Sequence, residues 1–142
     1  MNRFRHWIPA AGWAAMIFGL SCIPGEDLPP PPSILEYLQG FVSPDKFVHH
    51  LLYASLGWLC LRALVLERPT RNLMRAGLLA AALVSIYGAT DEWHQLLTPG
   101  RSCDFFDWLS DATGGIFGVT VALLGYAALR RAGRLPHPAS KP

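Results

Sequence analysis

Apolar residues occur in four long blocks along the chain, separated by segments that hold most of the charges. The blocks cover residues 7–23, 47–66, 73–89 and 108–129. A helix of about 20 residues spans the ~30 Å hydrocarbon core of a bilayer, and about 17 residues still suffice. Helices also satisfy their own backbone groups in lipid. The pattern therefore predicts an all-α integral membrane protein, a four-helix bundle formed by one domain over residues 1–142.

The composition supports a membrane protein and argues against other classes. Hydrophobic residues make up 51% of the chain and charged residues only 15%. A soluble chain of 142 residues would need polar helix faces, which these blocks lack. The net charge of +2 and the absence of a basic stripe indicate no nucleic-acid partner. The three cysteines have no CxxC spacing, so they predict no zinc site, and a Cys22–Cys103 pair stays open.

The Lys and Arg residues are distributed unevenly between alternate connections. Ten of the 12 fall in the N-terminal segment, the second connection and the tail, whereas the other two connections hold only Lys46 and Arg101. Basic residues stay on the cytoplasmic side of membrane proteins. We therefore expect both termini to be cytoplasmic, with residues 130–142 as a short basic tail.

The N-terminal block has a second interpretation. Residues 1–22 combine a basic start, an apolar run and Leu20-Ser21-Cys22, as lipoprotein signals do. Gly19 stands where such a signal has a branched apolar residue. We therefore favour a retained first helix, with cleavage at Cys22 as the alternative.

Polar residues gather at three helix ends, all on the predicted outer side. The segment Ser43–Lys46 is typical of a helix start, and from it Asp45, His49 and Tyr53 repeat every four residues and share one face. We expect a role for only one of His49 and His50. The next helix ends in Asp91-Glu92-Trp93-His94-Gln95. Two adjacent acids oppose the dipole at a helix C-terminus, so local helix energetics do not explain them.

The last block begins with an acidic stripe. Asp104, Asp107 and Asp111 follow at i, i+3 and i+7, so they share a face that descends into the membrane. An acid near the bilayer centre costs roughly 2.5–3.5 kcal/mol, so Asp111 requires a partner or a wet pocket. Lys46 and Arg101 are the two basic residues on the predicted outer side, and either could neutralise Asp111 or hold an anionic ligand. The small residues Gly114 and Gly118 predict close packing of another helix.

These motifs together resemble the VanZ-like family of bacterial membrane proteins. The resemblance runs from about residue 45 to 118 and rests on Asp45-Lys46, His49, Tyr53, Leu56-Gly57, Asp91-Glu92, His94-Gln95, Pro99-Gly100-Arg101, Asp107, Asp111, Gly114, Gly115 and Gly118. It implies a multi-pass protein of the bacterial cytoplasmic (inner) membrane. The family is named for an accessory protein associated with low-level resistance to teicoplanin, a glycopeptide antibiotic. Asp111 stands where the family often has Asn.

The favoured function is a polar site at the extracytoplasmic face that acts on or binds cell-envelope lipids or glycopeptide-related ligands. Arginine and lysine suit phosphate oxygens, so they predict anion binding. The candidate catalytic residues are His49, Asp91, Glu92, His94 and Asp107. The candidate anion-binding residues are Lys46, Arg101, Tyr53 and Gln95, with Asp45 and Asp111 as buried polar groups. No cofactor is predicted by name, although Asp91, Glu92 and His94 could bind a divalent metal ion.

Two alternatives stay open. A non-catalytic membrane module could use the Pro-rich segment with Tyr37 and Leu38 to modulate how antibiotics or partners reach the cell surface. Proton-coupled transport through Asp111 ranks last, because the cytoplasmic halves of the helices lack polar residues and a narrow bundle would need to form a homo-oligomer.

Overall fold

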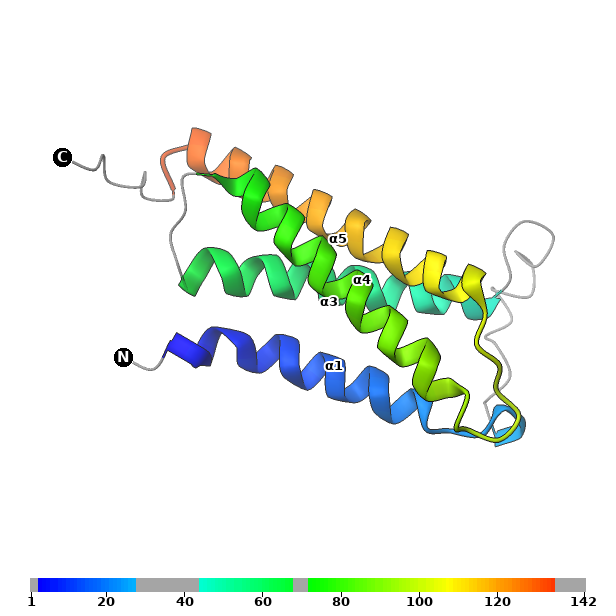
Figure 1. Ribbon diagram of the computed structural model, residues 1–142. Coiled ribbons are helices and arrows are strands. Elements are labelled where there is room, and N and C mark those ends of the chain that lie inside the picture. Colours follow the sequence, from blue (N-terminus) through cyan, green and yellow to red (C-terminus); the bar gives the residue numbers. More distant parts are fainter. Residues whose placement is uncertain (1–2, 28–43, 68–71, 135–142) are drawn as a thin grey trace.

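The chain folds into helices that lie side by side (Figure 1). The computed structural model describes residues 3–27, 44–67 and 72–134, and the fold and site are discussed for these residues. Their elements are the 3₁₀ helix η1 (Arg3–Trp7), α1 (Ile8–Ser21), the 3₁₀ helix η2 (Gly25–Asp27), α3 (Pro44–Glu67), α4 (Leu73–Gln95) and α5 (Phe105–Arg131). The described residues form no strand, which confirms the all-α prediction.

Three of the four α-helices are long and apolar enough to cross a membrane: Lys46–Glu67, Leu73–Gln95 and Phe105–Arg131. They support a multi-pass membrane protein. The helix α1 has only 14 residues, but η1 continues it at its N-terminus (Figure 1). At 2.0 Å per 3₁₀ residue and 1.5 Å per α residue, the two together are about 31 Å long. A fourth span is therefore sterically feasible and stays a prediction.

Consecutive α-helices run in opposite directions, so each end of the bundle collects alternate helix termini (Figure 1). One end holds the C-termini of α1 and α4 and the N-termini of α3 and α5. We call it the acid-rich end, because Asp91, Glu92, Asp104, Asp107 and Asp111 lie there. The other, the basic end, holds the start of η1 and the end of α5. Their placement in the cytoplasm stays a prediction.

Local sequence signals fix several helix termini. The side chain of Asn72 caps α4 by accepting from the Arg75 N–H at 2.9 Å. The side chain of Asp104 caps α5 by accepting from the Phe106 N–H at 2.8 Å. Gly133, with φ of 67°, ends α5 by donating to the Arg130 carbonyl while Arg134 donates to Leu129. This Schellman motif requires a left-handed residue, which glycine supplies without strain.

Close backbone contact joins α3 to α5. A methyl group on Gly118 would overlap the carbonyl group of Ala54, and one on Gly57 would overlap the carbonyl group of Gly115. A methyl group on Gly114 would likewise overlap the His50 carbonyl. The predicted role of Gly114 and Gly118 in helix packing is therefore confirmed. Glycine faces of this kind allow helices to approach closely in lipid.

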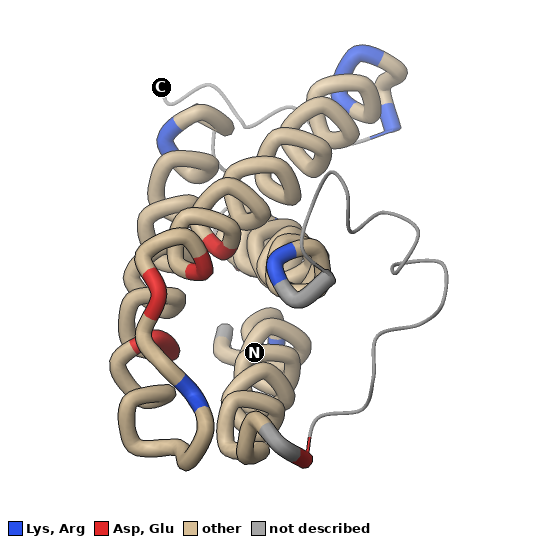
Figure 2. Tube along the Cα trace, turned by 90° about the vertical axis from the view of Figure 1, so that its right-hand side faces the viewer, with Lys and Arg blue, Asp and Glu red and all other residues tan. Residues whose placement is uncertain are grey.

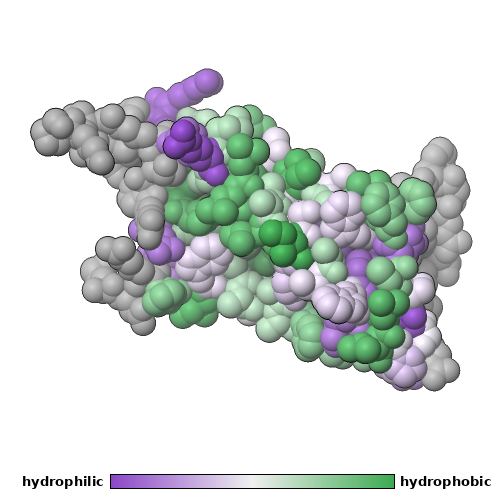
Figure 3. All heavy atoms as spheres, viewed as in Figure 1, coloured by the Kyte–Doolittle hydropathy of each residue, from purple (hydrophilic) through white to green (hydrophobic). Residues whose placement is uncertain are grey.

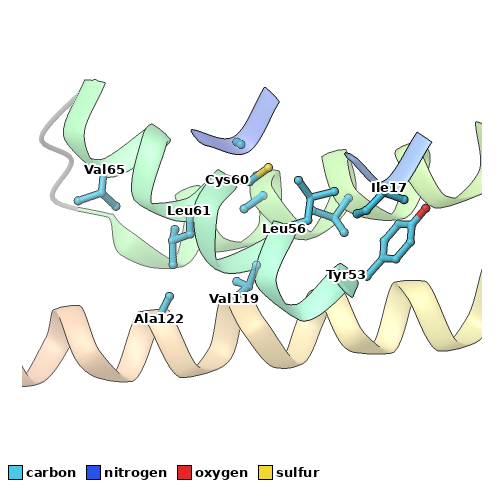
Figure 4. Packing of buried hydrophobic residues seen from close by; sticks show 11 residues of the cluster. Ile17, Tyr53, Leu56, Cys60, Leu61, Val65, Val119 and Ala122 are labelled. Carbon is cyan, nitrogen blue, oxygen red and sulfur yellow. The ribbon is translucent and has the colours of Figure 1, made fainter. Parts of the chain in front are cut away.

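Buried hydrophobic side chains fill the space between these helices (Figure 4). Leu56, Leu61, Val65 and Val119 belong to this core, and Tyr53 stands at one end of the row. Hydrogen bonds attach α1 and η1 at the edge of the bundle: Trp13 Nε1 donates to the Leu52 carbonyl at 2.9 Å, Tyr87 Oη to the Ala14 carbonyl at 2.7 Å, and Trp7 Nε1 to Glu67 Oε2 at 2.7 Å.

The surface matches a bilayer environment. Hydrophobic residues cover the middle of the face shown in Figure 3, and hydrophilic ones lie toward its ends. The tube in Figure 2 shows most acidic residues gathered around one end, where only few basic residues lie. Exposed apolar side chains such as Leu78, Ile86 and Leu124 face the region where lipid chains would be.

Candidate functional site

Three acidic side chains are buried at the acid-rich end. Asp91 and Glu92 are each 3% exposed, and Asp111 is fully buried at 0%. Asp91 and Glu92 come from the last turns of α4, and Asp111 from the second turn of α5. Ionised carboxylates avoid low-dielectric surroundings unless they are paired or bind a metal ion. Their partners therefore decide what the site can do.

Asp111 pairs with His49 of α3. The His49 Nδ1 atom lies 2.9 Å from Asp111 Oδ1. The His49 ring lies parallel to the Tyr53 ring, with centroids 6.4 Å apart and an interplanar angle of 5°. The α3–α5 glycine contacts set the distance between the two helices and so bring this histidine to this acid. The partner of the buried Asp111 is therefore His49, and not Lys46 or Arg101, the two candidates that the sequence offered.

Glu92 adds a third helix to the same cluster. One of its oxygens, Oε2, accepts from the backbone N–H of Asp104 at 2.9 Å. Ligand-type atoms of His49, Glu92 and Asp111 all lie within 4.8 Å of one another. Each residue comes from a different helix, so the cluster exists only in the folded bundle. We call these three residues the acid–histidine cluster.

Asp91 connects the site to α1. Its Oδ2 atom accepts a hydrogen bond from Ser21 Oγ at 2.8 Å. Thr98 Oγ1 donates to the Ser21 carbonyl at 3.1 Å, so the turn after α4 holds the same residue. Gln95, only 2% exposed, lies one turn after Asp91. Ser21 was not predicted as a site residue, because the segment around it was interpreted only as helix or lipoprotein signal.

Several buried polar atoms at this end have no hydrogen-bond partner among the described residues. They are Tyr53 Oη, Asp91 Oδ1, Glu92 Oε1, His94 Nδ1, Gln95 Nε2 and Asp111 Oδ2. Native proteins pair nearly all buried polar groups, and unpaired ones need an explanation such as a water, an ion or a functional role. Their concentration here makes the acid-rich end the candidate functional site.

Lys46 is engaged by two other acids. Its Nζ donates to Asp104 Oδ2 at 3.1 Å and also to Asp107 Oδ1. Both acids belong to the stripe that begins α5, and Asp104 is the more exposed of the two, with a side chain 40% exposed. The helix-capping N–H of Phe106 and the Lys46 ammonium hold the pKa of Asp104 below its ordinary value of 3.8. Lys46 therefore does not have a free charge for an anionic ligand.

Arg101 serves the connection between α4 and α5. Its Nε donates to the Ile23 carbonyl at 3.3 Å, and the neighbouring Pro99 carbonyl accepts from the Gly25 N–H at 3.2 Å. A methyl group on Gly25 would overlap the Gly100 carbonyl, so the two loops are in close contact. Arg101 is half-buried and is not among the partners of the buried acids. Its predicted anion-binding role stays a prediction.

The remaining predicted residues lie around the cluster. His94 packs on Phe18, with ring centroids 4.4 Å apart, and its Nε2 lies 4.0 Å from Cys22 Sγ. His50 faces Thr113 and Phe117. The predicted metal set of Asp91, Glu92 and His94 does not form a cluster among the described residues. Glu92 is offset from Asp91 by about 100° around α4 and groups with residues of α3 and α5 instead. Ser43 and the side chain of Asp45 lie outside the described residues.

All three cysteines are free, with Cys22 and Cys103 exposed and Cys60 buried. No curated protein and no solved structure matches the chain. The family model described as VanZ/LLP1 matches residues 6–126. The match covers α1, α3, α4 and most of α5, and every residue of the acid–histidine cluster. This match confirms the resemblance predicted from the polar motifs. The chain is a member of the VanZ/LLP1 family.

Proposed function

We propose that this VanZ-like envelope protein binds or acts on a cell-envelope lipid or glycopeptide-related ligand at its acid-rich end, and so contributes to teicoplanin-type antibiotic resistance. The observation that carries the proposal is the convergence of His49, Glu92 and Asp111 from three helices. Asp91 and Tyr53 add further buried polar atoms without partners. Carboxylate and hydroxyl oxygens accept hydrogen bonds from hydroxyl, amide and ammonium groups, which sugars, peptides and lipid headgroups carry.

Exposed apolar side chains surround the acid-rich end and support its placement at headgroup depth. Trp93 is 73% exposed and Leu97 is 80% exposed, and Phe105 and Phe106 lie nearby at 63% each. Aromatic side chains prefer the interface between the hydrocarbon core and water. In the bacterial cytoplasmic membrane, with the basic end inside, this interface would be that of the outer leaflet. Envelope lipids and glycopeptides are both accessible there.

The test is the teicoplanin susceptibility of a sensitive host that expresses the wild type, His49→Gln or Asp111→Asn, with membrane levels measured for each. Wild type should protect the host. Both variants should abolish protection, because each removes one member of the His49–Asp111 ion pair that joins α3 to the buried acid of α5. His50→Gln and Asp27→Asn are matched controls outside the cluster, and both should protect as well as wild type.

Arg101→Ala separates two versions of the proposal. If Arg101 binds an anionic headgroup, the variant should lose protection at normal membrane levels. Its contacts to loop backbone instead favour retained protection. The proposed site would be refuted if wild type gave no protection. It would also be refuted if His49→Gln and Asp111→Asn, present at normal membrane levels, protected fully.

The exposed apolar residues also favour a second candidate, a non-catalytic interaction module. Trp93, Leu96 and Leu97 would then contact a partner, together with the Pro-rich segment 28–38, which lies outside the described residues. Deleting residues 28–38 should abolish protection in that case, whereas Asp111→Asn should not affect it. The opposite result would favour the polar site.

A further inference from the structure

The acid-rich end holds more buried acid than the described residues neutralise. Asp91, Glu92 and Asp111 are all at most 3% exposed, yet among the described residues His49 is the one basic side chain at ion-pair distance from any of them. Lys46 is bound to Asp104 and Asp107. A buried, uncompensated carboxylate costs several kcal/mol or takes up a proton. A bound cation is the other physical solution.

The arrangement of the acid–histidine cluster matches a cation site. His49 Nδ1 and Asp111 Oδ1 lie 2.9 Å apart. Two ligand atoms about 2.1 Å from one ion are about 3.0 Å apart in octahedral and about 3.4 Å apart in tetrahedral coordination, so the pair would open by at most about 0.5 Å. Glu92 completes a set within 4.8 Å, so a movement of its side chain would bring it into the same shell. Glu92 Oε1 and Asp111 Oδ2 are buried and have no hydrogen-bond partner.

We propose that His49, Glu92 and Asp111 bind one divalent transition-metal ion, Zn²⁺ or Mn²⁺. The ligand chemistry selects this class, because imidazole favours Zn²⁺ and related ions whereas carboxylates also suit Mn²⁺. One nitrogen and two carboxylate oxygens balance the charge of a divalent ion. Mg²⁺ and Ca²⁺ prefer sites made of oxygen alone and are the weaker fit.

A metal ion at this position would specify how the proposed function binds its ligand, and the biological role of the ion rests on that proposed function. Three protein ligands leave at least one coordination position open in a tetrahedral ion. A phosphate or carboxylate oxygen of an envelope ligand could take that position. This would give the site an affinity for anions that Lys46, already bound to two acids, does not supply.

The first experiment measures metal binding to the full chain, purified in detergent or nanodiscs and treated with a chelator. Zn²⁺ and Mn²⁺ are titrated separately by calorimetry, and the metal content of untreated protein is determined by elemental analysis. Wild type should bind one equivalent of one of these ions. The measurement needs no antibiotic phenotype, so failure here is distinct from failure of the proposed function.

Three variants test the ligands: His49→Gln, Glu92→Gln and Asp111→Asn. Each should weaken binding by more than about 100-fold, because loss of an outer-shell partner alone costs about 10–100-fold. His50→Gln and Asp27→Asn should bind as wild type does, and so should His94→Gln, which tests the set predicted from sequence. Thermal unfolding should show stabilisation by the metal in wild type and controls and none in the three variants.

Co²⁺ binding to the wild type provides a second readout that does not depend on whether the variants fold. Its visible absorption spectrum in wild type should indicate a nitrogen ligand, and a saturating amount of Zn²⁺ should abolish that spectrum. Absence of stoichiometric binding to wild type would overturn the proposal. So would unchanged affinity in folded Glu92→Gln and Asp111→Asn, which would place the ion elsewhere.

Discussion

The two ends of the bundle carry their charges differently. At the basic end, Arg5, Arg75, Arg131 and Arg134 are exposed, and the acid found there, Glu67, accepts a hydrogen bond from Trp7. At the acid-rich end, three carboxylates are turned inward and buried. Exposed charges can remain solvated at any membrane surface, and exposed basic residues influence the orientation of a membrane protein. Buried charges cost free energy unless they have partners, and this difference is why the acid-rich end is the candidate site.

The largest expected effect tests which end faces outward. A membrane-impermeant maleimide applied to intact cells should label the wild type, because Cys22 and Cys103 are exposed at the acid-rich end. A Cys22→Ser, Cys103→Ser, Ala132→Cys variant presents its exposed thiol at the basic end and should be labelled only after the cells are opened. Cys60 is buried and should contribute little in either protein. The reverse labelling pattern would place the acid-rich end in the cytoplasm.

The next effect concerns the close backbone contact between α3 and α5. Gly118→Val would force side-chain atoms into the Ala54 carbonyl and should destabilise the protein by about 3 kcal/mol or more, since overpacking against backbone cannot relax easily. Unfolding in mixed micelles with increasing SDS measures the change. Gly125→Val is the matched control on α5, because Gly125 has open space around its Cα.

Equal destabilisation by Gly118→Val and Gly125→Val would show that the close α3–α5 contact contributes nothing specific. In that case the geometry of the acid–histidine cluster would not depend on the glycine face. A specific effect should also reduce metal binding and antibiotic protection, because both proposals need His49 and Asp111 at hydrogen-bond distance.

The smallest effect belongs to an outward acid. The lowered pKa of Asp104 means that its ionised form stabilises the native state; this contribution is present above the ordinary value of 3.8 and is lost as pH falls through the lower native pKa. Asp104→Asn keeps the N-cap, since Asn caps as well as Asp. As the pH is lowered from about 5 to about 2, the unfolding temperature of the variant should fall slightly less than that of wild type. A larger fall in the variant would contradict this assignment.

The helices and the clustering of polar residues at one end could be predicted from sequence, because apolar blocks and charge asymmetry act along the chain. The predicted position of Asp91 and Glu92 at the end of their helix follows from local spacing and agrees with α4. The length of the first helix was harder to judge. Its apolar block runs to residue 23, but α1 ends at Ser21, and the N–H of the C-cap residue Cys22 donates to the Phe18 carbonyl.

The pairing of side chains across helices could not be predicted in the same way. Lys46 and Arg101 were the two candidates to neutralise Asp111, but its partner is His49. The difference depends on how α3 and α5 are rotated against each other, and backbone contacts at Gly57, Gly114 and Gly118 set that rotation. The contact of Asp91 with Ser21 likewise depends on where α1 ends, which periodicity does not determine.

The distribution of the acid–histidine cluster over α3, α4 and α5 has a consequence for biosynthesis. During translation His49 and Glu92 leave the ribosome before Asp111, so the cluster is completed only when the last helix enters the membrane. A chain truncated before α5 exposes the glycine-contacting face of α3 and lacks the partner of His49. Such an incomplete product differs chemically from the finished protein at one buried spot, and membrane quality control could recognise it there.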